Sequence, residues 1–287
     1  MGRRAIGWSP GHLSGYFRRI GGESPGTTGS TGAGVVIREG VTAVAEPAEV
    51  PQVVVSRRSP EGALSVLATT SPPLEYALGR LGVPARVTTE TALPIGAGFG
   101  LSAAALLAGL SALDHLYSLG LGRRGVAALA HEAEIVHRTG LGDVAACLGG
   151  GFDCREGAGI DGGITRIPAE GESLSALTFG PIPTPAVLSS ADALARVEQA
   201  YPGRCPQDIP DFFRLSRAFA EKSGLLTPRV RDVLSACDRA GIPASMTMLG
   251  EGVFALGREA GDVLAPFGEV LPLQVAGAGF TPGEDLP

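Results

Sequence analysis

The sequence predicts a two-part protein of the α+β class. Its 287 residues, 44% of them hydrophobic, are enough to bury one elaborate core or two smaller ones. Segments rich in β-branched residues occur together with segments of helical periodicity in both halves, and the pattern changes near residue 167. We therefore expect an N-terminal half over residues 1–170 and a C-terminal half over residues 171–287.

The first elements of the N-terminal half are predicted to be strands. Residues 3–8 form a short strand in this prediction, and the glycine-rich stretch 10–34 forms a loop. Three strands bounded by glycine and proline follow, with the sequences GVVIRE, VTAVAE and QVVVSRR. A helix is expected over 71–81, because Pro72 and Pro73 stand at its start and Gly82 follows its end.

The remaining elements of this half surround a second set of glycines. Residues 83–94 form a strand, and residues 101–118 form a helix that is apolar nearly all round and hence buried. A second helix, 124–138, is amphipathic, and a glycine-rich hairpin covers 149–166. The apolar stripe of the amphipathic helix is predicted to consist of Val126, Leu129, Ala130, Ala133 and Val136.

The C-terminal half mixes short strands with helices. Strands are expected near 175–179 and 185–189, and helices near 191–200, 209–222 and 227–240. PASMTML and GVFALG then indicate a hairpin, and LPLQVAGA a last strand.

Charge and cysteine content exclude several classes of function. A net charge of −6 and a pI of about 5.3 lack the basic footprint of a nucleic-acid-binding protein. The four cysteines form no CxxC pair and no zinc spacing, so we expect them to be reduced and mostly buried. No uninterrupted apolar run of membrane-spanning length and no signal peptide is recognised, so we expect a soluble, cytoplasmic protein with no membrane partner.

The stretch PIGAGFGLSAAALLAGLSAL, residues 94–113, places three glycines directly before the buried helix. It lacks the GK[ST] of a Walker A loop, the chain has no HRD or DFG motif of a protein kinase, and Leu101 replaces the third glycine of a dinucleotide fingerprint. Two interpretations remain: a tight strand-to-helix turn, or a loop that binds phosphate through its own amides.

A phosphate loop of that kind is chemically plausible here. Gly96, Gly98 and Gly100 allow the backbone to curl so that successive N–H groups face one anion, and the helix adds the positive end of its dipole. Lys222 is the only lysine, so backbone donors would carry most of the attraction. Ser102, in the first turn of the helix, could cap it or reach a magnesium ion.

Three ordered motifs resemble those of the GHMP kinases, the small-molecule kinases named after galactokinase, homoserine, mevalonate and phosphomevalonate kinases. PxGxGxGxSxA resembles the second motif, with Leu101 in place of its first serine. SPGHLSGYF, at 9–17, resembles the first motif without its closing Glu-His, and MTMLGEGVFAL, at 246–256, resembles the third. Together with TGSTGAG and AHEAEIVHRTGLGD, they resemble the archaeal branch that phosphorylates the 4-hydroxyl of pantoate on the way to coenzyme A.

The resemblance implies a fold, a reaction and cofactors. The fold is the two-domain GHMP kinase fold, with an N-terminal half like ribosomal protein S5, which binds ATP, and a ferredoxin-like C-terminal half. The reaction uses ATP and Mg²⁺ to phosphorylate the small molecule (R)-pantoate; relatives are often dimers, so a homodimer is compatible. Other small alcohols, such as shikimate, homoserine or mevalonate derivatives, remain alternative substrates, and a non-catalytic ligand-binding relative is a third interpretation.

The resemblance also implies roles for individual residues. Glu134 is the acidic metal ligand with Ser102 as its partner, although spacing alone leaves Glu132 as a rival. Asp143, in TGLGD, acts as general base or orients the acceptor hydroxyl. The residues expected to bind the nucleotide are Pro94, Gly96, Ala97, Gly98, Phe99, Gly100, Leu101 and Ser102.

The carboxylate of pantoate needs donors or positive charge in its pocket. Arg155 is the first choice, because it is the sole basic residue between Asp143 and Gly163. His131 lies one helical turn before Glu134 on the same side of its helix. The other candidates for contact with the substrate are His12, Ser30 and Thr184.

Overall fold

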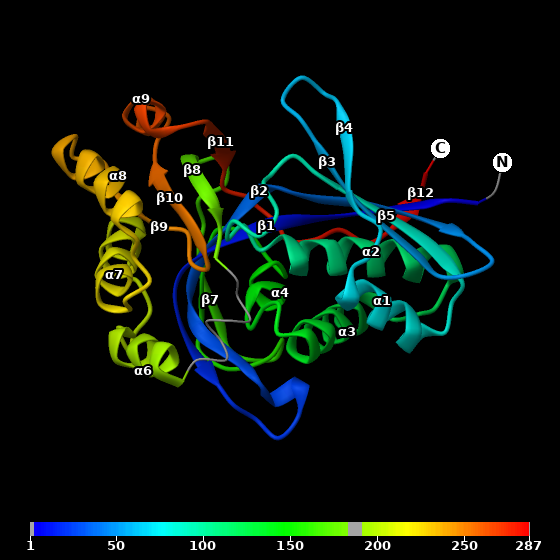
Figure 1. Cartoon of the computed structure of the whole chain (residues 1–287). Helices are drawn as coiled ribbons and strands as arrows, with labels where there is room; N and C mark the ends of the chain where they lie inside the picture. The colour runs from blue at the N-terminus through cyan, green and yellow to red at the C-terminus, as the bar shows by residue number, and fades with distance from the viewer. Residues whose placement is uncertain (1–2, 183–190, 287) are drawn as a thin grey trace.

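The computed structural model describes residues 3–182 and 191–286, and it contains two β-sheets with helices packed on them (Figure 1). The larger sheet has the strand order β12-β1-β2-β5-β3-β4, and the β6–β7 hairpin pairs with β2 beside this path. Its strands are β1 (Ala5–Ile20), β2 (Gly29–Pro47), β3 (Gln52–Arg58), β4 (Leu64–Ala68), β5 (Ala85–Thr91), β6 (Phe152–Arg155), β7 (Ile164–Ile167) and β12 (Glu284–Asp285).

Strands β1 and β2 form a long antiparallel ribbon where a loop was expected. The predicted loop 10–34 is wrong: except for a short turn with the 3₁₀ helix η1 (Pro25–Thr27), these residues continue the two strands, and the ribbon pairs from Ala5 opposite Ala45, through Pro10 opposite Gly40, to Ile20 opposite Gly29. The glycines here serve close contacts. A Cβ on Gly7 would lie 2.2 Å from the carbonyl oxygen of Ala108, so its absence lets a helix pack directly on the strand.

Helix α2 packs on one face of the larger sheet, and α1 and α3 pack against α2 and against each other (Figure 1). Helix α1 (Pro72–Leu81) begins with two prolines and ends at Gly82, which adopts the left-handed conformation. Helix α2 (Leu101–Tyr117) is buried along most of its length, as predicted. Helix α3 (Gly122–His137) buries Val126, Ala130 and Ala133 of the predicted stripe and half-buries Leu129, but the side chain of Val136 is exposed, so that part of the prediction is wrong.

The smaller sheet has the order β11-β8-β10-β9; helices α7, α8 and α9 pack on it, and α6 packs on α7 and β1. Phe152 of β6 stacks edge-on against Phe212 of α7 with ring centroids 4.9 Å apart, so one apolar cluster joins the two sheets. The elements are β8 (Ser173–Pro181), β9 (Ala244–Met246), β10 (Gly250–Leu256), β11 (Val270–Gln274), α6 (Ala191–Ala200), α7 (Ile209–Lys222), α8 (Pro228–Arg239), α9 (Ala260–Leu264) and η2 (Ala265–Phe267).

The expected strand near 185–189 lies outside the described residues. Strand β4, helix α9 and strand β12 were not predicted. No helix in the described part of the chain is both long and apolar enough to cross a membrane.

The cysteine prediction needs a correction. Cys154 of β6 and Cys205, in the segment before α7, form a disulfide, whereas Cys147 and Cys237 are free and buried. The pair escaped sequence analysis because 51 positions separate the two residues, and only the fold brings them together.

Candidate active site

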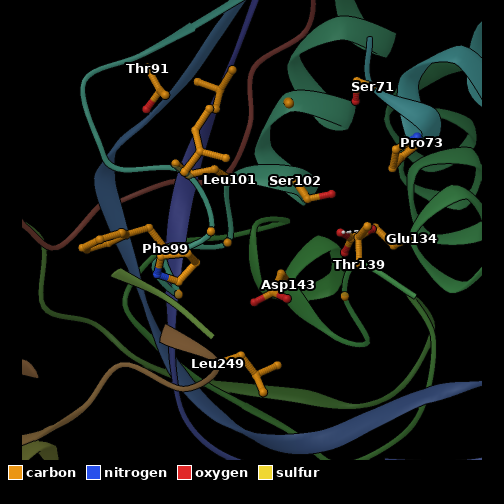
Figure 2. A pocket seen from close by; sticks show the side chains of 18 of the residues that line it. Ser71, Pro73, Thr91, Phe99, Leu101, Ser102, Glu134, Thr139, Asp143 and Leu249 are labelled. Atoms are coloured by element: carbon orange, nitrogen blue, oxygen red, sulfur yellow. Dashed lines mark hydrogen bonds between the residues drawn. The ribbon is translucent and has the colours of Figure 1, made fainter. Parts of the chain in front are cut away.

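A cavity of about 650 Å³ opens at the N-terminus of α2. Both parts of the molecule line it: the larger sheet and its helices form most of the wall, and Pro181, Ile182, Met248 and Leu249 close it from the side of the smaller sheet. Figure 2 shows lining residues from both parts, among them Phe99, Asp143 and Leu249. The three motifs identified in the sequence therefore meet around one space.

The loop of residues 94–100 before α2, called the glycine loop here, owes its shape to residues without Cβ atoms. Gly96, Gly98 and Gly100 have φ angles of 78°, 86° and 63°, in the left-handed region that favours glycine. A Cβ on Gly98 would also lie 2.8 Å from the carbonyl oxygen of Met248. On the other side the amide of His12 donates to the carbonyl of Phe99 at 3.0 Å, so the loop is held between β1 and the β9–β10 turn.

Most of the residues expected to bind the nucleotide line the cavity. They are Gly96, Gly98, Phe99, Gly100, Leu101 and Ser102. Pro94 and Ala97 do not line it, and Ala97 is buried in the apolar core beneath the loop. None of the described lining residues is a lysine or an arginine. Attraction for an anion therefore comes from the first amides of α2 and the positive end of its dipole.

Glu134, near the end of α3, presents its carboxyl group to the cavity beside Ser102 and Thr139 (Figure 2). Thr139 Oγ1 donates to Glu134 Oε1 at 3.2 Å, whereas the buried Oε2 has no hydrogen-bond partner among the described residues. A Cβ at Gly140 would lie 2.2 Å from Oε2, so glycine is needed to leave room for the carboxyl group.

Burial raises the pKa of Glu134 to about 8, and the neighbouring charge of Asp143 adds to the shift. The hydroxyls of Ser102 and Thr139 oppose it. An oxygen atom without a partner beside a second oxygen donor fits Mg²⁺, which prefers oxygen ligands and keeps phosphate and water in its shell. The rival Glu132 does not line the cavity, because Tyr76 and Arg80 bind its carboxylate.

Asp143 is the first residue of the short helix α4 (Asp143–Ala146) and lines the cavity (Figure 2). Its Oδ1 lies 2.7 Å from Nδ1 of His12, and Nε2 of His12 lies 2.8 Å from Oδ2 of Asp153. Arg155 pairs with the other oxygen of Asp153. His12 and Arg155 are therefore buried behind the wall of the cavity, and both ring nitrogens of His12 face carboxylates.

These contacts fix the charge on Asp143. Burial alone would raise its pKa, but the hydrogen bond and charge of His12, with the charge of Arg155, outweigh burial and lower the pKa. Burial likewise opposes the charge on His12, and the two carboxylates outweigh it and raise the pKa of His12.

The other residues expected to contact the substrate differ in their placement. Ser30 lines the cavity. A Cβ on Gly142 would lie 2.6 Å from Oγ of Ser30 and 2.7 Å from Nε of Arg155, so Gly142 lies close to both side chains. Nε of Arg155 is a buried hydrogen-bond donor without a partner among the described residues. His131 is buried and donates from Nε2 to the carbonyl of Thr28 at 2.9 Å. Thr184 lies outside the described residues.

Sequence analysis missed Thr139 and Asp153. The signal for Asp153 was available, because Asp153 and Arg155 stand two positions apart in a strand, where opposite charges share one face. Thr139 directly follows the helix that carries Glu134, and its amide donates to the carbonyl of Glu134 at 3.0 Å.

The chain is similar to known proteins over most of its length. The model of the GHMP kinases N terminal domain matches residues 66–151, which include the glycine loop, Glu134 and Asp143. A pantoate kinase of Methanospirillum hungatei is 46% identical over 96% of this chain and 95% of its own length.

Solved structures show the same fold. A phosphotransferase related to the CoA biosynthesis pathway superposes with a TM-score of 0.81 at 25% identity, over 98% of both chains. A complex of MDDEF with MVAPP, AMPPCP and magnesium shares the fold, with a TM-score of 0.66 at 15% identity over 99% of both chains. With the near full-length match to the Methanospirillum protein, these findings show that the chain belongs to the pantoate kinase family of the GHMP kinases.

Proposed function

We propose that the protein transfers the γ-phosphoryl group of ATP to the 4-hydroxyl of (R)-pantoate, giving ADP and 4-phosphopantoate for coenzyme A synthesis. One observation carries the proposal: a single cavity brings together a glycine loop at a helix N-terminus, the Ser102–Glu134 pair and the carboxylate of Asp143, which His12 holds. Phosphoryl transfer depends on positioning and charge neutralisation, and this cavity supplies groups for both.

The triphosphate belongs at the glycine loop, because the amides from Gly98 to Ser102 and the dipole of α2 offer donors that no lysine replaces. Ser102 and Glu134 would hold Mg²⁺, whose charge neutralises phosphate oxygens when it is bound. The fold neighbour that contains AMPPCP and magnesium supports this assignment only at the level of the fold.

Asp143 acts at the acceptor end. Its Oδ1 is held by His12, so Oδ2 is left to accept a hydrogen bond from the hydroxyl of pantoate. In the transfer, the bond from Pγ to the ADP oxygen breaks, and the bond from Pγ to the hydroxyl oxygen of pantoate forms. The hydroxyl proton passes to Asp143 or to solvent.

The carboxylate of pantoate would bind near Ser30 and Gly142. Ser30 Oγ and the buried Nε of Arg155 both abut the Gly142 backbone, and an unpaired buried donor is a favourable partner for a carboxylate. His131 does not reach this position itself, but its hydrogen bond to the carbonyl of Thr28 fixes the start of the strand that carries Ser30. Thr184 stays a candidate from the sequence alone.

Three further proposals concern the whole protein. The chain divides into an ATP-binding domain over 1–170 and a second domain over 171–287, and the larger and smaller sheets support this division apart from β12.

A cytoplasmic location suits an ATP-dependent enzyme, although the Cys154–Cys205 disulfide is unusual for that compartment. A homodimer follows only from the resemblance, and light scattering on the purified protein checks it.

An ADP-release assay over a panel of hydroxy acids and alcohols tests the proposed reaction. With ATP and Mg²⁺, we expect turnover of pantoate to exceed that of shikimate, homoserine and mevalonate at equal concentration. Activity on another alcohol without activity on pantoate would overturn the substrate assignment.

Asp143→Ala in the same assay separates an enzyme from a ligand-binding relative. We expect kcat on pantoate to fall by at least ~10²-fold, the usual scale for loss of a positioned acid or base. Pantoate and ATP binding, followed by calorimetry, should persist. An unchanged rate would remove Asp143 from the mechanism, and binding without turnover in the wild type would favour a sensor.

A further inference from the structure

A chain of four charged side chains extends from the cavity into the interior of the protein. Asp143 stands at the cavity, and behind it follow His12 of β1 and then Asp153 and Arg155 of β6. His12, Asp153 and Arg155 are each at most 2% exposed, so water is kept from the contacts among these three residues, whereas Asp143 is in part exposed to the cavity. Asp143 has been assigned a role from sequence, whereas Asp153 has none.

Counting protons along this chain restricts the state of His12. A neutral imidazole has one N–H and one lone pair, so it can donate to one carboxylate only. Here both ring nitrogens lie within 2.8 Å of carboxylate oxygens. With both carboxylates ionised, both nitrogens must carry protons, because a lone pair would otherwise face a carboxylate oxygen.

The balance of charges and the packing around His12 are both consistent with a ring that is protonated on both nitrogens. The four groups then carry two negative and two positive charges, which sum to zero in a buried region. Arg155 NH1 lies 3.5 Å from His12 Nε2, and each donates to a different oxygen of Asp153. A Cβ on Gly34 would lie 2.0 Å from His12 Nε2, so strand β2 leaves space for the ring only because residue 34 is glycine.

We propose that Asp153 is a positioning residue of the phosphoryl transfer, which holds His12 as a doubly protonated imidazolium against Asp143. The inference rests on the proposed kinase function and deepens it. Asp143 is kept as a carboxylate with Oδ1 engaged and Oδ2 directed to the acceptor hydroxyl. His12 cannot accept the hydroxyl proton, because neither ring nitrogen has a free lone pair, so His12 is not a proton relay.

Replacing Asp153 by asparagine removes one of these charges at almost constant shape. Asp143 from α4 and Asp153 and Arg155 from β6 are the charged groups that face the His12 ring, while β2 and the glycine loop offer only backbone there. In Asp153→Asn one carboxylate no longer raises the pKa of His12, and burial still lowers it. His12 therefore loses its proton at a lower pH than in the wild type.

The first experiment reads His12 directly, without any substrate. Nitrogen-15 NMR of the protein labelled at its four histidines should show both ring nitrogens of His12 protonated at about pH 8, with the signals assigned by their loss in His12→Gln. Asp153→Asn should abolish that state. A neutral His12 ring in the wild type at this pH would overturn the proposal, and turnover of pantoate does not affect this readout.

The second experiment measures catalysis. We expect kcat of Asp153→Asn to fall at least about tenfold, the lower end of the scale for loss of the outer partner of a metal-ligating histidine, with KM for ATP little changed. The ratio of its kcat to that of the wild type should fall further as pH rises, since the variant loses the imidazolium at a lower pH than the wild type. An unchanged kcat would overturn the positioning role.

Two further variants keep the test decisive if Asp153→Asn does not fold. His12→Lys retains a cation between the two carboxylates, and His12→Gln does not, so the lysine variant should keep the higher kcat. Equal rates in the two would count against the proposal. Asp161→Asn is the matched control, because Asp161 is an exposed acid in the same hairpin region, paired with Arg124, and its loss should leave kcat unchanged.

Discussion

Gly98 shows how one residue without a side chain shapes the glycine loop. Its φ angle of 86° disfavours any residue with a Cβ, and the carbonyl oxygen of Met248 occupies the place that a Cβ would need. The sequence pattern predicted the first constraint, because alternating glycines before a helix are typical of a phosphate loop. The second could not be predicted, since Met248 lies 150 positions further along the chain in a turn whose position depends on the fold.

Gly98→Ala should therefore weaken nucleotide binding. We expect KM for ATP to rise at least about tenfold, which corresponds to about 1.4 kcal/mol, because the loop must shift away from Met248. Steady-state kinetics at saturating pantoate measures it. Gly79→Ala is the control: a Cβ there meets no neighbour within 4 Å, and the residue lies in helix α1. A KM equal to that of the wild type would contradict the role of the loop.

The partners of His12 mark the limit of sequence analysis at the residue scale. The sequence identified His12, Asp143 and Arg155 as candidates and placed all three at the substrate. The structure instead joins His12 to residues 131 and 141 positions away, with both ring nitrogens engaged. Long-range pairing of this kind depends on strand register, which glycine-rich strands specify weakly.

At the scale of elements, helices were predicted better than strands. The three helices α6, α7 and α8 lie where the sequence placed them, because local signals mark their ends. Asp208 accepts from the amide of Asp211 at 2.8 Å, and Thr227 accepts from that of Val230 at 3.3 Å, as N-caps do. Residues 10–34 of the β1–β2 ribbon are predicted as a loop because their glycines, which permit close packing, are also the commonest signal of a turn.

The Cys154–Cys205 disulfide links β6 to the segment before α7, and its reduction should destabilise the protein. Its two cysteines are 51 positions apart in the sequence. A cross-link of this span restricts the conformations of the unfolded chain and so raises the free energy of unfolding by about 2–4 kcal/mol. We expect dithiothreitol to lower the free energy of unfolding of the wild type by that amount in a urea titration.

Cys205→Ser supplies the control for the disulfide. It should be less stable than the wild type without reductant and should not respond to dithiothreitol. Peptide mapping under non-reducing conditions verifies the bond. A wild type whose unfolding midpoint is the same with and without reductant would contradict this prediction.

On the scale of the whole molecule, the site depends on two sheets meeting. The glycine loop, Glu134 and Asp143 belong to the part built on the larger sheet, while Met248 and Leu249 come from the β9–β10 turn of the smaller one. One apolar cluster joins both sheets through Phe152 and Phe212, so the two walls of the cavity are packed together. The sequence predicted the two halves, and the domain boundary at residue 170 stays a prediction that falls between β7 and β8.

We expect main-chain amides at the start of α2, with no lysine or arginine from the described lining, to bind the phosphates of ATP. The decisive measurement is a crystal structure of the protein with AMPPCP, Mg²⁺ and pantoate. Phosphate oxygens should lie within hydrogen-bond distance of the amides between Gly98 and Ser102, with Mg²⁺ at Ser102 and Glu134. An ordered triphosphate bound elsewhere, with the loop unoccupied, would show that these amides do not hold the phosphates.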